Sequence, residues 1–125
     1  MLSVIVVPTG EEQAKIQRGF DPDVSNIFSR DFSSSSELES YIDGLESLGD
    51  LVEWEIVSET PKSVTVEIDG DEVQSTFENE IDKKAYLSGL EDGDGWMSPL
   101  VVREDEDPDL FQRLSGLINA YLAKP

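Results

Sequence analysis

The stretch VTVEIDGDEV, residues 64–73, decides the class of fold because it has the pattern of two strands joined by a tight turn. Apolar and polar residues alternate on both sides of Asp69-Gly70, a dipeptide typical of two-residue type I′ turns. Such a turn sets Val66 opposite Val73 and gathers the apolar side chains on one face. The sequence therefore predicts a β-hairpin with one apolar and one solvated face.

Further strands are predicted on either side of this hairpin. Val52, Trp54 and Ile56 alternate with glutamates, which indicates a strand with one solvated face and places Trp54 in the core. The apolar segments at residues 2–7 and 100–103 predict two more strands.

Helices are predicted mainly from the residues that cap them. Ser36-x-x-Glu39 is a capping box that opens a helix ending at Leu48. Asp-Pro-Asp combines a cap, a proline suited to the first helical position and an acidic first turn, and it occurs twice. We also expect a helix over residues 11–18 after a Thr9 cap, and a short helix from Asp21 to about Arg30 with Phe20, Val24, Ile27 and Phe28 on one face. Residues 79–90 are expected to form a helix capped by Asn79, with Ile81, Ala85 and Tyr86 inward. The final helix is expected from Asp107 to Leu122, with an apolar stripe of Leu110, Phe111, Leu114, Leu117, Ile118, Tyr121 and Leu122. Residues 91–95 are expected to form an acidic loop.

These elements predict the α+β class. We expect one domain over residues 1–125, built on a mainly antiparallel sheet of four to five strands with helices packed on one face.

Composition excludes several reaction classes. The chain has 125 residues with no His and no Cys, which removes Ser-His-Asp hydrolysis, cysteine nucleophiles and Cys/His zinc sites. We single out no catalytic residue and expect no cofactor. The chain has no apolar run of about 18 residues and no basic segment before its first strand, so we expect no membrane span, no signal peptide and a cytoplasmic location.

The charge balance indicates the kind of partner. Asp and Glu number 28 against 9 Lys and Arg, for a formal net charge of −19. The basic residues are scattered, so we expect no direct contact with nucleic acid and none with an anionic membrane. A surface of this sign attracts cations or a basic protein.

An acidic row on the helix after Ser36 gives the first candidate binding residues. Glu39, Asp43, Glu46 and Asp50 follow one another at i, i+4, i+7 and i+11. They lie away from the predicted apolar stripe of this helix, which consists of Leu38, Tyr41, Ile42, Leu45 and Leu48. Their spacing of about 5–6 Å is close to that of phosphates along a nucleic-acid strand. Trp96 is a fifth candidate, as an aromatic anchor beside acidic residues. The alternatives are that any helix of so acidic a chain shows such a row, and that Trp96 covers the edge of the core.

The patterns that would indicate a metal site or a catalytic site are weaker than the acidic row. Asp92 and Asp94 alternate with glycines and are candidates for an irregular cation site, although positions one and twelve of a calcium loop are wrong. Asp69, Asp82 and Lys84 are similar to the Asp…(Asp/Glu)-x-Lys pattern of restriction-endonuclease-like nucleases, whose carboxylates hold Mg²⁺. Lys83 stands where that family has an apolar residue, and Asp69 is better suited to the hairpin turn.

Three functions remain open. The first is a non-catalytic module that blocks or carries a basic protein, as immunity proteins, nuclease inhibitors and nucleic-acid mimics do. This chain resembles such proteins in size and charge, without a shared motif. The second is an enzyme that uses carboxylates or a divalent metal. The third is an acidic domain whose charge reflects adaptation to a salty environment.

Overall fold

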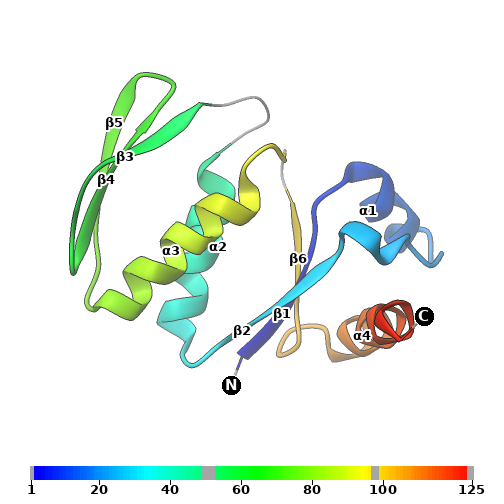
Figure 1. Cartoon of the computed structure of the whole chain (residues 1–125). Coiled ribbons are helices and arrows are strands. Elements are labelled where there is room, and N and C mark those ends of the chain that lie inside the picture. Colours follow the sequence, from blue (N-terminus) through cyan, green and yellow to red (C-terminus); the bar gives the residue numbers. More distant parts are fainter. Residues whose placement is uncertain (1, 49–52, 97–98, 124–125) are drawn as a thin grey trace. The chain divides into compact units, whose positions relative to one another are not determined.

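The computed structural model describes residues 2–48, 53–96 and 99–123 (Figure 1). The chain folds into helices and antiparallel strands, which confirms the α+β class. Its contacts group into two compact units, a terminal unit (Met1–Ser33 and Ser98–Pro125) and a central unit (Ser34–Met97). The described residues form two three-stranded sheets, one in each unit, instead of the predicted single sheet of four to five strands.

The terminal unit is built around a strand that is central in its sheet. β1 (Leu2–Val7) lies between β2 (Phe28–Phe32) and β6 (Leu100–Arg103), and both neighbours are antiparallel to it. The predicted strands at residues 2–7 and 100–103 are therefore confirmed. The helices of this unit are α1 (Gly10–Gln17), the short 3-10 helix η1 (Val24–Asn26) and α4 (Pro108–Leu122). Its core cluster consists of Ile5, Val7, Ile16, Ile27, Val102, Phe111 and Leu114.

The predicted short helix between Asp21 and Arg30 is wrong. Asp23, rather than Asp21, accepts a backbone hydrogen bond, and the turn it caps lasts only through η1. The next residues form β2, whose backbone pairs with β1 over five residues. The buried Glu12 side chain accepts the Asp23 backbone N–H and so ties this segment to α1. Pairing with a neighbouring strand outweighs the cap signal, because local propensity is weak beside tertiary contacts.

The central unit contains the predicted hairpin in the predicted register. β3 (Trp54–Thr60), β4 (Ser63–Ile68) and β5 (Asp71–Thr76) form an antiparallel sheet in that order. Val66 lies opposite Val73, and the backbone angles φ of Asp69 and Gly70 are 50° and 87°. A type I′ turn requires positive φ at both central residues, so the turn chemistry explains the register.

Helices α2 (Ser35–Ser47) and α3 (Glu80–Gly93) lie side by side in the central unit (Figure 1). Their backbones touch through glycines, since a Cβ on Gly89 would lie 2.1 Å from the Tyr41 carbonyl oxygen. A Cβ on Gly44 would lie 2.1 Å from the Tyr86 carbonyl oxygen. The interior glycine that weakens α2 as an isolated helix therefore permits this close packing. The sheet contributes Val64 and Val66 to the same core, with Leu48, Tyr86 and Leu90.

The ends of α3 differ from the prediction in two respects. Asn79 caps the helix as expected, and Ala85 and Tyr86 are buried, but Ile81 is 59% exposed. The helix also continues through Gly93, so residues 91–93 do not form the expected loop.

The N-terminal caps of three further helices can be compared with the caps predicted from the sequence. Thr9 and Asp107 cap α1 and α4, as expected. In α2 the cap is Ser34, whose Oγ accepts from the Glu37 backbone N–H, and Ser36 is inside the helix. Four members of the predicted apolar stripe of α2 are buried, namely Leu38, Tyr41, Leu45 and Leu48, and the fifth, Ile42, is half-buried.

Candidate functional site

The negative charge of the chain is concentrated in the central unit. Of the 28 acidic residues 18 fall within residues 34–97, together with only 3 of the 9 basic residues. This segment therefore carries a formal charge of −15 out of −19. An acidic interaction surface is therefore expected on the central unit.

The solvated face of the β3-β4-β5 sheet carries a row of three glutamates, which we name the sheet carboxylates. Glu55 of β3 is paired with Glu67 of β4, and Glu67 is paired with Glu72 of β5. Paired residues on neighbouring strands have their side chains on the same face, about 4.5–5.5 Å apart at Cβ. Like charges directly opposite one another repel, so the row is retained at a cost in stability.

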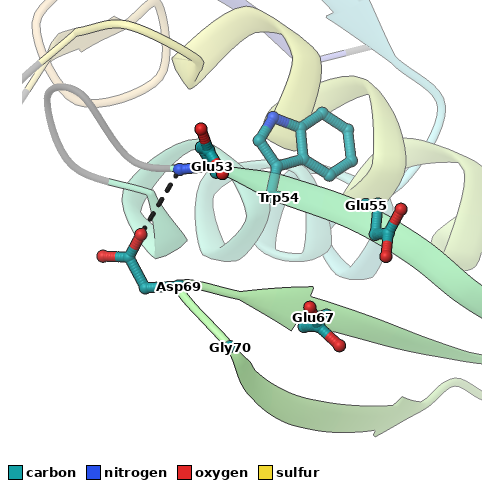
Figure 2. A pocket seen from close by; sticks show the side chains of 6 residues that line it. All are labelled: Glu53, Trp54, Glu55, Glu67, Asp69 and Gly70. Carbon is teal, nitrogen blue, oxygen red and sulfur yellow. Dashed lines mark hydrogen bonds between the residues drawn. The ribbon is translucent and has the colours of Figure 1, made fainter.

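A pocket of about 620 Å³ opens at one end of this row (Figure 2). Glu53, Glu55, Glu67, Asp69 and Gly70 line it together with Trp54. The carboxylate of Asp69 accepts a hydrogen bond of 3.4 Å from the Glu53 backbone N–H, across the end of the two strands. The Trp54 indole lies on the helix side of β3 and packs against the core, as the alternation predicts. The lining of the pocket therefore offers four carboxylates.

Two of the three lysines of the central unit, Lys83 and Lys84, form ion pairs with residues other than the sheet carboxylates. The Lys83 side chain is only 5% exposed, and its Nζ lies 2.7 Å from Glu59 Oε1 and donates to the Thr60 carbonyl oxygen at 2.9 Å. Lys84 is paired with Glu80 on the surface of α3. Among the ion pairs between described residues, none involves a sheet carboxylate. This face therefore keeps its negative potential.

The acidic row predicted on α2 is present over its described part. Glu39, Asp43 and Glu46 are exposed on the helix, and none of them belongs to an ion pair between residues that the structure describes. Asp50, the fourth predicted member, lies outside the described residues. We name Glu39, Asp43 and Glu46 the helix row.

Trp96 follows the end of α3 and is half-buried. Its backbone N–H donates to the Gly93 carbonyl oxygen at 3.1 Å. Among the hydrogen bonds and ion pairs of the described residues, none joins Trp96 to the helix row.

The residues singled out as metal or nuclease candidates form hydrogen bonds, a helix cap and a turn that stabilise the fold. Asp92 accepts a 2.6 Å hydrogen bond from the Tyr41 hydroxyl, and Asp94 caps the end of α3. Asp69 forms the hairpin turn, and the buried Asp82 accepts from Ser36 Oγ at 3.3 Å. Within residues 2–48, 53–96 and 99–123, no group of three or more acidic side chains is arranged to hold a metal ion.

A separate apolar groove lies in the terminal unit. It has a volume of about 290 Å³ and is lined by Val24, Ser25, Ile27, Phe28, Ser29, Ile118, Tyr121 and Leu122. Tyr121 and Leu122 end the predicted apolar stripe of α4 but are exposed. None of the described helices has the length and apolar composition needed to cross a bilayer.

Comparison of the chain with protein-family models, with curated proteins and with solved structures gives no match. The candidate site therefore depends on its own geometry.

Sequence reasoning missed the sheet carboxylates as a site, although part of the signal was readable. The turn at Asp69-Gly70 that pairs Val66 with Val73 also pairs Glu67 with Glu72. The third member, Glu55, depends on the register of β3, which shifts between Ile56 and Ser58. Alternation alone does not locate such a shift.

Proposed function

We propose that the chain is a non-catalytic binding module whose central unit captures a basic protein, and so blocks or carries it. The observation that supports this function best is the charge of −15 within residues 34–97, together with carboxylate rows that no described cation neutralises. Immunity proteins and nucleic-acid mimics are the kinds of protein that act in this way.

The mechanism follows from electrostatics. A coherent negative field raises the rate at which a basic protein meets the surface, over a range of about 8–10 Å at moderate salt. Once docked, the sheet carboxylates and the helix row offer acceptors at regular spacing to Lys and Arg side chains. Trp96, half-buried beside the end of α3, is the proposed aromatic contact.

The test is retention of proteins from a source lysate on the immobilised chain, with stepwise elution by NaCl. Three variants are compared with the wild type. The first changes Glu55, Glu67 and Glu72 to Gln, the second reverses Glu39, Asp43 and Glu46 to Lys, and the control changes the exposed Glu11, Glu104 and Asp109 of the terminal unit to amides.

We expect the wild type and the control to retain the same basic protein and at least one of the first two variants to lose it. Retention of that protein by all variants alike would contradict the proposal. The salt-adaptation alternative is tested on the chain alone, because a fold adapted to salt unfolds when NaCl is lowered. We expect the chain to stay folded at low salt.

A further inference from the structure

The outer edge of the central sheet is open along β5. The ladder between β4 and β5 runs through six consecutive pairs without a shift in register. A two-residue turn makes the flanking pair, Ile68 and Asp71, hydrogen-bonded to each other, and hydrogen-bonded pairs then alternate along the ladder. The bond from the Phe77 N–H to the Lys62 carbonyl oxygen, 2.8 Å, continues this alternation.

The same alternation directs the other backbone groups of β5 outward. Glu72, Gln74 and Thr76 are the residues whose N–H and C=O groups point away from β4. Among the described residues, no backbone hydrogen bond uses these outward groups, and all three residues are exposed. An edge of this kind is a template for another strand.

β5 has only acidic charges, Asp71 and Glu72, among the features that usually protect such an edge, and these do not oppose a basic strand. It contains no proline, no basic residue and no bulge, whereas β3, the opposite edge, is interrupted by the register shift between Ile56 and Ser58. In the terminal unit β6 has only four residues, and β2 carries Arg30. β5 is therefore the best-formed open edge of the described chain.

The side chains around this edge favour one kind of strand. The row of sheet carboxylates ends at Glu72 on the edge strand, so a residue opposite Glu72 on an added strand continues the row. On the other face of β5, Val73 is 43% exposed. An added strand thus meets the Glu72 carboxylate, at the end of the row, on one face and a partly open apolar surface on the other.

We infer that β5 pairs with an extended segment of the basic partner, in which Lys or Arg alternates with apolar residues, and that this segment becomes the fourth strand of the sheet. The inference rests on the proposed function and specifies its binding mode: backbone bonds to Glu72, Gln74 and Thr76 supply affinity, and alternate side chains supply specificity. Pairing of β5 with a second copy is disfavoured, because each central unit carries a charge of −15.

Synthetic peptides test this binding mode without knowledge of the partner. The probe is acetyl-Lys-Val-Lys-Val-Lys-amide, which aligns its lysines with the three outward residues and its valines with Val73 and Ser75. One derivative is N-methylated at two lysine amides, which face β5 in this alignment. The matched derivative is N-methylated at the two valine amides, which face solvent. Charge and number of methyl groups are the same in both.

We expect the unmodified and the valine-methylated peptides to bind within about twofold of each other and the lysine-methylated peptide to bind at least about tenfold more weakly. Hydrogen exchange followed by NMR should show new protection of the Glu72, Gln74 and Thr76 amides. Q74P, which removes one outward N–H at an edge position, should also weaken binding of the unmodified peptide. If Q74P does not fold, the comparison of the two methylated peptides on the wild-type chain still tests the inference.

Equal binding of both methylated peptides would overturn the inference and leave charge attraction, and hence the proposed function, standing. Absence of binding by every peptide would overturn it as well, with the lysate experiment deciding the proposed function separately. Protection of the same three amides in the chain alone, together with a dimer in sedimentation, would assign the edge to a second copy and overturn it.

Discussion

Replacement of Glu67 by Gln should stabilise the central unit. Glu67 is the middle sheet carboxylate and faces two like charges, Glu55 and Glu72, one on each neighbouring strand. Cross-strand pairs contribute about 0.2–1 kcal/mol each, so removing two repulsive pairs should raise the free energy of unfolding by about 0.5–1.5 kcal/mol. For a chain of this size the melting temperature should rise by about 2–6 °C.

The assay is thermal and urea unfolding followed by tryptophan fluorescence, because Trp54 and Trp96 both belong to the central unit. The gain should shrink when NaCl is raised from about 20 mM to about 500 mM, since salt screens exposed charges. The control is E78Q, which makes the same charge change just before the N-terminus of α3, where a negative charge is favourable. Destabilisation by E67Q, or an equal gain from E78Q, would refute the reasoning.

Three further outcomes follow from the packing and the ion pairs. Gly89→Ala should destabilise the central unit by about 3 kcal/mol, because the added Cβ would collide with the α2 backbone. Gly116→Ala in α4 adds a Cβ that meets open space, and it should stabilise the chain by up to about 1 kcal/mol. Urea unfolding measures both changes. Lys83→Met should cost about 1–3 kcal/mol in the same assay, because it removes the hydrogen bond from the buried Lys83 ammonium to the Thr60 carbonyl oxygen and its ion pair with Glu59. The Arg103 guanidinium donates two hydrogen bonds to Asp105 and holds the pKa of that carboxyl below its ordinary value. The contribution of this pair to stability is therefore present above the ordinary pKa of an aspartate and is lost as the pH falls through the lowered pKa. In an NMR titration, R103Q should raise the pKa of Asp105 toward its ordinary value.

The parts of the fold that were predictable are those whose chemistry is local. Asp69-Gly70 determines a turn type and thereby a register, and Asp107-Pro108 marks the start of α4, because cap and turn residues act on the backbone next to them. The errors occur where distant contacts decide. Residues 28–32 become a strand because β1 offers a pairing edge, and α3 extends to Gly93 through packing against α2.

The candidate site likewise has one part that local sequence predicts and another that depends on distant contacts. The helix row was predictable because the period of a single helix places Glu39, Asp43 and Glu46 on one side. The complete row of sheet carboxylates was not, because it requires the registers of three strands at once, including the shifted β3. The concentration of charge in the central unit also depends on a boundary that contacts define and composition does not.

The most direct test of the account measures the affinity of the purified chain for the basic protein that it retains, as a function of NaCl concentration. The wild-type chain is compared with the variant that carries Gln at positions 55, 67 and 72. The account predicts that the wild-type affinity falls about tenfold or more between about 50 mM and about 500 mM NaCl, and that the variant binds more weakly with a shallower dependence on salt. Affinity that is independent of salt, or that changes neither on loss of these three carboxylates nor on reversal of Glu39, Asp43 and Glu46 to Lys, would contradict it.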